Sequence, residues 1–135
     1  MSRCAHTRSW RQVLLTICGA VVLVIAGLAA DVAAEKQWHR CNDISGSPLC
    51  LVIDGELDGK GHVGVRYHKK SGPVRSIRLY IASCGRAKEL VSEGNIAPTQ
   101  LKLGGKWKSL SYSSCWVGYL RIGNTQWTTG EVVTR

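Results

Sequence analysis

The chain has 135 residues and a formal net charge of +9 at pH 7, from 18 Lys and Arg against nine Asp and Glu. This length leaves room for one small domain and excludes a multidomain protein. The excess of basic charge favours an anionic partner over a basic one. The sequence contains neither a Gly-x-Ser-x-Gly nucleophile elbow nor a CxxC pair, which argues against a serine hydrolase and against a zinc site.

The N-terminal part of the sequence has the pattern of an export signal. Three arginines precede an apolar run over residues 13–30, and the small residues 32–34 follow it. We therefore predict that residues 1–34 form a signal peptide, a helix that is cleaved after Ala34. Because the apolar run is 18 residues long, an uncleaved signal anchor is the alternative. Both interpretations place the C-terminal part outside the cell, either secreted or tethered to the membrane.

Cleavage would leave 101 residues with a net charge of +7 and four cysteines, Cys41, Cys50, Cys84 and Cys115. An even number of cysteines in a small exported domain predicts two disulfides. Of the three ways to pair them, we favour Cys41–Cys50 and Cys84–Cys115, because the turn-rich stretch 42–49 can bend back on itself. Each bridge should contribute on the order of 2–4 kcal/mol to stability.

The rest of the sequence alternates short apolar and polar stretches, separates them by turn residues and lacks the pattern of an amphipathic helix. This predicts an all-β domain over residues 49–135, a small antiparallel sandwich or barrel of about seven strands. Residues 35–48 are expected to form a polar lead-in and a turn, mobile up to Arg40. The expected strands are, in chain order, 49–53, 62–68, 74–83, 99–103, 106–113, 115–122 and 126–134, with a loop at 85–98 and turns at 104–105 and 123–124.

Two of these strands are expected to pair as a long hairpin. Residues 62–68 and 74–83 flank a Lys-Lys-Ser-Gly-Pro turn. In the second strand, Ile77, Leu79 and Ile81 fall on one face because side chains alternate along a strand. In size, cysteine count and strand spacing, the plan resembles small exported, disulfide-stapled β-domains of bacteria.

The acidic residues predict neither a metal site nor a cofactor site. Asp54, Glu56 and Asp58 alternate like the start of a calcium-binding loop, but the bidentate Glu expected downstream is missing. A solvated acidic turn is therefore favoured over a weak calcium site.

The histidines do not predict a catalytic site. Glu56, His62, Arg66 and His68 are residue types that a small secreted ribonuclease could use, but no motif surrounds them. His62 and His68 are six residues apart, which is about 20 Å along an extended strand. We expect both to be surface histidines.

The strongest candidate for a binding site is a basic segment with one aromatic residue. Lys102, Lys106 and Lys108 surround a Gly-Gly pair and are expected on one side of a hairpin tip, with Trp107 beside them. A tryptophan in this setting can stack on a sugar or a base, or insert among lipid headgroups.

Other aromatic residues leave two interpretations open. Tyr119 and Trp127 could extend the surface around Trp107. Alternatively, Trp107, Trp116 and Trp127 could fill the core, because the sequence has no phenylalanine.

Taken together, these observations predict a secreted, basic, monomeric binding domain with no catalytic residues. Its expected partner is an anionic surface polymer or an acidic protein. A nucleic acid would match the positive charge, but no sequence motif supports it. Contact with a membrane is expected only through the leader. A secreted antimicrobial or inhibitory effector is the alternative, followed by a small hydrolase such as a ribonuclease.

Overall fold

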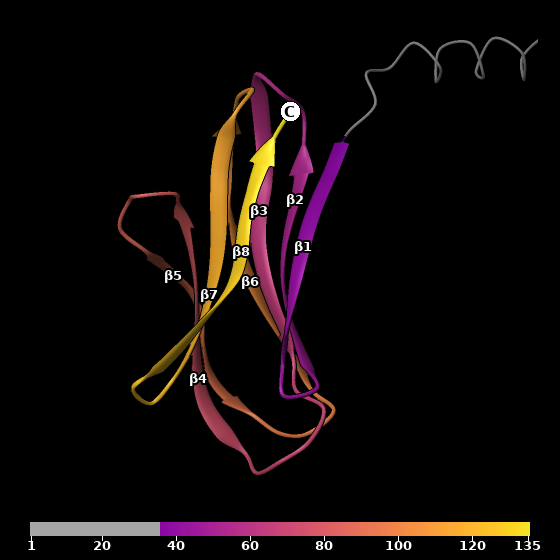
Figure 1. Cartoon of the computed structure of the whole chain (residues 1–135), viewed down its shortest axis with the longest axis vertical. Helices are drawn as coiled ribbons and strands as arrows, with labels where there is room; N and C mark the ends of the chain where they lie inside the picture. Colours follow the sequence, from indigo (N-terminus) through magenta and orange to yellow (C-terminus); the bar gives the residue numbers. More distant parts are fainter. Residues whose placement is uncertain (1–35) are drawn as a thin grey trace, which may run out of the picture. The chain divides into compact units, whose positions relative to one another are not determined.

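The computed structural model describes residues 36–135, so the predicted leader lies outside the described residues. The described part is all β and antiparallel (Figure 1). One sheet has the strand order β1-β2-β3-β6 and the other has the order β5-β4-β7-β8. The strands are β1 Lys36–Ile44, β2 Ser47–Gly55, β3 Gly59–His68, β4 Arg75–Ser83, β5 Glu89–Ile96, β6 Leu101–Leu110, β7 Ser114–Ile122 and β8 Thr125–Thr134.

The core lies where the two four-stranded sheets face each other. Alternate residues of each strand point inward, and the inward set is almost entirely aliphatic. Burying each such side chain stabilises the fold by about 1.5–3 kcal/mol relative to leaving it exposed. Fully buried members of the core include Leu49, Leu51 and Ile53 of β2, Val63 of β3, Ile77, Leu79 and Ile81 of β4, and Leu120 of β7. The expected inward face of 74–83 is therefore confirmed.

The expected polar lead-in is wrong for residues 36–44, which form β1. This strand pairs with β2 over its whole length, from Lys36 opposite Gly55 to Ile44 opposite Ser47. Between them, Ser45 and Gly46 both have positive φ, 53° and 87°, the geometry of a tight hairpin turn. Most β1 side chains are exposed, so the strand leaves little apolar signal in the sequence.

The expected loop at 85–98 contains β5. The described residues form eight strands rather than seven, because β1 and β5 are additional and the two strands expected at 99–103 and 106–113 are one strand, β6. The edge strand β5 pairs only with β4, and a bulge between Leu79 and Tyr80 shifts its register. Gly94 interrupts it with a φ of 141°. A bulge and an unpaired edge break the regular alternation by which a strand is recognised.

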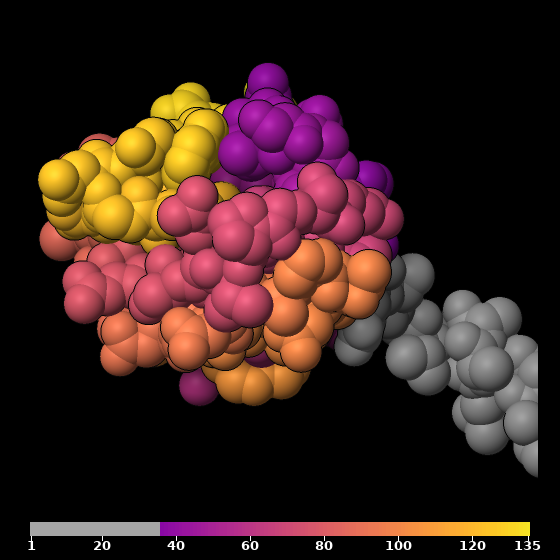
Figure 2. Space-filling model, turned by 90° about the horizontal axis from the view of Figure 1, so that it is seen from below, coloured from indigo at the N-terminus to yellow at the C-terminus, as the bar shows by residue number. Residues whose placement is uncertain are grey.

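The expected hairpin of 62–68 with 74–83 is also wrong. β3 and β4 belong to different sheets, and the connection between them crosses from one sheet to the other. Lys69 is anchored there, because its N–H donates to the carbonyl of Gln100 (3.0 Å) and its carbonyl accepts from the N–H of Thr99 (2.8 Å). Figure 2 shows this end of the domain, with the connection in rose across the middle. Alternation of apolar and polar residues shows which face of a strand is buried. It does not show whether two consecutive strands pair in one sheet or pack against each other from opposite sheets.

The expected turn at Gly104-Gly105 lies in the middle of the continuous strand β6, which pairs with β3 from His68 opposite Leu101 to Gly59 opposite Leu110. The two glycines allow close packing instead of a turn. A Cβ on Gly104 would collide with the carbonyl of Val91 on β5, and one on Gly105 would lie 2.5 Å from Cε1 of His62. The turn at 123–124 is confirmed between β7 and β8.

Both predicted disulfides are confirmed within the described residues. Cys41–Cys50 joins directly opposite positions of β1 and β2, and Cys84–Cys115 joins the end of β4 to the start of β7. Disulfides of this kind are typical of proteins from an oxidising compartment. Among residues 36–135 there is no helix long and apolar enough to cross a membrane.

Candidate anion-binding site

The four predicted binding residues lie on both faces of β6. Lys102, Lys106 and Lys108 point toward β5 of the other sheet, because they share a face with the buried Leu110. Trp107 lies on the opposite face, exposed on the outside of its sheet. The structure therefore brings the three lysines together and separates them from the tryptophan.

Glu89 on β5 lies between two of these lysines. Its carboxylate is 2.6 Å from Nζ of Lys108 and 3.3 Å from Nζ of Lys106. The hydrogen bond from Lys108 is the main cause that holds the pKa of the Glu89 carboxyl below its usual value. Burial opposes this effect, and the hydrogen bond from Lys106 adds to the lowering. One negative charge thus offsets part of the positive charge of the segment.

Replacing Glu89 by Gln is expected to lower Tm slightly at pH 7, because each partly exposed ion pair contributes at most about 1 kcal/mol. Since the pKa of Glu89 is lowered on folding, its contribution is full above its ordinary pKa of 4.5 and is lost as pH falls through the folded value. Thermal unfolding from pH 7 to pH 2.5 should therefore show the two Tm curves converging in acid. Glu56→Gln, at an exposed position, is the control. A gap in Tm that persists in acid would contradict the assigned role of the carboxylate.

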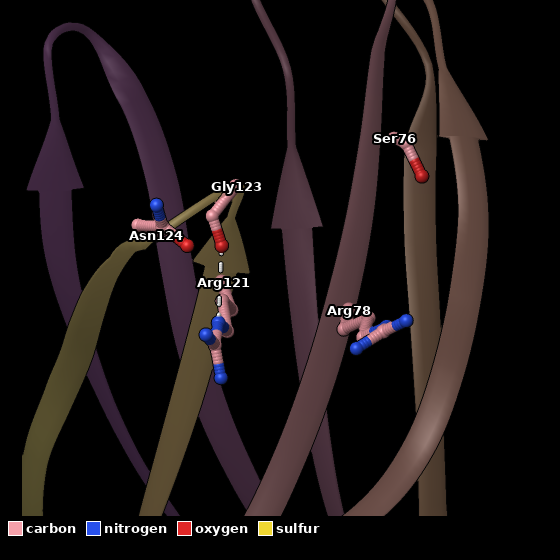
Figure 3. Close-up of a pocket in the computed structure, with 5 residues that line it drawn as sticks. All are labelled: Ser76, Arg78, Arg121, Gly123 and Asn124. Carbon is pink, nitrogen blue, oxygen red and sulfur yellow. Dashed lines mark hydrogen bonds between the residues drawn. The ribbon is translucent and has the colours of Figure 1, made fainter.

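A second basic site lies on the outer face of the other sheet. Arg78 of β4 and Arg121 of β7 are directly opposite each other in the register of the two strands. With Ser76 and the turn residues Gly123 and Asn124, they line a cavity of about 380 Å³. Figure 3 shows Ser76 on the Arg78 side of this cavity and the turn on the Arg121 side. The cavity is therefore lined by cationic and hydrogen-bonding groups.

The two guanidinium groups have different partners. Nε of Arg78 is 3.3 Å from a carboxylate oxygen of Glu93, whereas Nε of Arg121 donates to the carbonyl of Gly123 at 3.0 Å. Among the described residues, Arg121 has no carboxylate within ion-pair distance. Both terminal amino groups of a guanidinium are donors, so an anion in the cavity could be bound by two parallel hydrogen bonds.

A further cation lies on the same face of this sheet. Nζ of Lys88 lies 5.2 Å from the ring centroid of Tyr80 and 5.3 Å from that of Tyr119, and it donates to the side-chain oxygen of Gln126. Tyr80 and Tyr119 are opposite each other, two residues along from Arg78 and Arg121. The outer face of this sheet therefore carries three cationic side chains near one another.

The tryptophans divide between core and surface. Trp116 is buried and Trp127 packs against the core, as one of the two open interpretations expected. Trp107 is 68% exposed. It lies on β6 of one sheet, whereas Tyr119 lies on β7 of the other, so the structure does not join them into one surface.

The acidic and histidine residues singled out in the sequence lie in and around the β2–β3 hairpin. Asp54 of β2 is directly opposite His62 of β3, and Glu56 and Asp58 lie in the turn that follows β2. His62 and His68 share the outer face of β3, six residues apart.

One group of metal-ligand residue types comes within 4.8 Å in the described part of the chain: Cys84, Cys115 and Glu131. Both sulfur atoms are joined in a disulfide. They are therefore not available as the thiolates that bind zinc.

Arg78 and Arg121 were not singled out as a site in the sequence. Both lie within expected strands, 74–83 and 115–122, but they are 43 residues apart. Only the register of β4 against β7 brings them together. Comparison of the chain with known protein families, curated proteins and solved structures finds no match.

Proposed function

We propose that this chain is an exported, non-catalytic binding domain for an anionic partner at or near the cell surface. The observation that carries the proposal is the pair formed by Arg78 and Arg121, which are opposite each other beside a cavity. The signal-peptide pattern and the two disulfides support export.

The arginine pair has a physical reason to bind an anion. Like charges directly opposite on neighbouring strands destabilise a sheet, and Glu93 offsets only the charge of Arg78. A sulfate, phosphate or carboxylate between the guanidinium groups would relieve the repulsion and accept hydrogen bonds from both. Ser76 and Asn124 add polar groups at the rim.

The lysines of β6 form a second basic surface in this proposal. Lys102, Lys106 and Lys108 would add long-range attraction for an anionic chain. Because Glu89 already pairs with two of them, we expect them to contribute less than the arginine pair.

The double variant Arg78→Gln/Arg121→Gln tests the proposal. A heparin-derived hexasaccharide, which carries sulfates and carboxylates, is the probe, and calorimetric titration at 50 mM NaCl is the measurement. Hydrogen bonds to charged groups contribute about 1.5–3 kcal/mol each, so we expect the Kd to rise by about 10- to 100-fold. The affinity of the wild type should fall at 300 mM NaCl as the charges are screened.

The matched control is Lys70→Gln/Arg86→Gln, which removes the same net charge at exposed positions outside the cavity. If this control loses as much affinity as the arginine variant, binding depends on net charge and not on the cavity. If Lys102→Ala/Lys106→Ala/Lys108→Ala loses more affinity than the arginine variant, the main contact is on β6.

A further inference from the structure

A shallow groove lies on the outer face of the sheet β1-β2-β3-β6, distinct from the arginine cavity on the other sheet. Gly64 of β3 lines the groove and is directly opposite Gly105 of β6. Val52, from β2, is beside Gly64 on the same face. The imidazole of His62 lies over these two glycines, because its Cε1 would be 3.2 Å from a Cβ on Gly64 and 2.5 Å from one on Gly105. The ring therefore forms one wall of the groove.

The volume of the groove is about 130 Å³. Enclosed pockets for drug-sized ligands have volumes of roughly 300–1,000 Å³. The groove is thus large enough for about one ring of a longer ligand, whose remaining rings would lie along the face.

An exposed aromatic residue lies next to the groove, against the ring of His62. Trp107 is 68% exposed and contacts the ring of His62 edge-to-face, with the centroids 5.4 Å apart and the planes at 74°. Leu103 is exposed on the same face of β6 and lines the groove. The indole is thus positioned by its neighbour while most of its surface is open to solvent.

Polar side chains line the rest of the groove: Asp54, His62 and Arg66. Asp54 is oriented by the side-chain amide of Gln37, which donates to its carboxylate at 2.7 Å. The carboxylate retains further acceptor capacity, and the guanidinium of Arg66 offers several donors. The groove therefore combines an apolar ring surface with hydrogen-bonding groups of both kinds.

The charges of this face indicate the chemistry of its ligand. By the strand register and alternation, the outward ionised residues on it are Asp43, Asp54, Lys60 and Arg66. Their formal charges cancel, although the domain as a whole is strongly basic. Such a face gives a polyanion no net electrostatic attraction. A neutral ligand rich in hydroxyl groups does not depend on such attraction for its binding.

We propose that this groove binds one ring of an uncharged saccharide chain. The C–H face of that ring would lie against the side chain of Leu103, and the next ring of the chain would stack on the indole of Trp107, which removes apolar surface from water. The hydroxyls of the ring in the groove would donate to Asp54 and accept from Arg66, replacing the water that those groups otherwise bind. The site is on a different sheet from Arg78 and Arg121, so this inference does not depend on the anion-binding proposal.

The test uses the purified protein with its disulfides formed, labelled with ¹⁵N, in 300 mM NaCl. The probes are uncharged hexasaccharides of glucose, N-acetylglucosamine, mannose, galactose, xylose and arabinose, each titrated to 20 mM. We expect at least one of them to shift the indole N–H signal of Trp107 and the amide signals of Gly64 and Gly105 along one saturable curve. The indole signal of the buried Trp116 should not move.

Three variants distinguish binding at this site from nonspecific binding. Trp107→Ala should abolish the shifts of the two glycine amides. Tyr112→Ala removes an aromatic side chain that is 62% exposed elsewhere on the domain, and it should leave them unchanged. Asp54→Ala should raise the Kd by about 5- to 20-fold, as expected when one hydrogen bond of about 1–1.8 kcal/mol is lost.

Three results would overturn the proposal. The first is that no hexasaccharide moves the Trp107 signal at 20 mM. The second is that the shifts survive in Trp107→Ala. The third is that oligothymidylate, added as a separate probe, moves the Trp107 signal and every saccharide fails to do so, which would assign the groove to nucleobases instead.

Discussion

The double variant Cys84→Ala/Cys115→Ala is expected to melt about 15 to 30 °C below the wild type. The bridge closes a sequence separation of 31 residues, for which the loss of chain entropy in the unfolded state amounts to about 3.7 kcal/mol. For a domain of about 100 residues, each kcal/mol shifts Tm by about 4 to 8 °C. Between the two cysteines lie β5 and β6, so the bridge restricts a large part of the unfolded chain.

The second disulfide provides an internal comparison for this prediction. Cys41–Cys50 spans only nine positions and joins strands that already pair along their whole length. The same relation gives about 2.7 kcal/mol for it. Thermal unfolding followed by circular dichroism, without reductant, should therefore rank wild type above Cys41→Ala/Cys50→Ala and that variant above Cys84→Ala/Cys115→Ala. The reverse order of the two variants would contradict loop length as the deciding factor.

Replacing Leu79 by Ala is expected to lower the free energy of unfolding by about 3 to 5 kcal/mol. Leu79 is fully buried in β4, a central strand between β5 and β7. Truncation there removes buried apolar surface and leaves a cavity that the surrounding sheets can close only in part. Leu120, opposite it on β7, is also fully buried, so the cavity would lie within the core.

The control is Leu103→Ala, which removes the same atoms from a side chain that is 62% exposed. We expect a loss of less than about 1 kcal/mol there. Urea denaturation at 25 °C, with a common m-value, measures both. Equal losses at the two positions would show that the core is not where the structure places it.

Local patterns along the chain were sufficient to predict the central strands. The inward face of β4 follows from alternation over the ten residues 74–83, and that alternation reflects burial of one face of a sheet. The pairing of Cys41 with Cys50 could be predicted for a similar reason, since a short turn-rich stretch between two cysteines can bring them together. These features depend on residues that are close in sequence.

Two of the four edge strands, β1 and β5, were missed because their side chains carry little apolar signal. Each pairs with one neighbour only, and its exposed residues are polar by the same chemistry as a loop. Gly104 and Gly105 were misread as a turn because a glycine can allow either a change of direction or a close approach. Here Val91 and His62 approach closely, and both lie far from the glycines in sequence.

The sequence by itself determined that this is a small basic all-β domain with two disulfides, because composition, alternation and cysteine spacing are readable along the chain. The tertiary structure alone decided which strands share a sheet, and hence which side chains meet. Arg78 faces Arg121 across 43 residues of sequence, and Lys108 meets Glu89 across 19. Strand pairing depends on contacts between residues far apart in sequence and is stabilised by the core as a whole. Both candidate sites are formed by residues that only this pairing brings together.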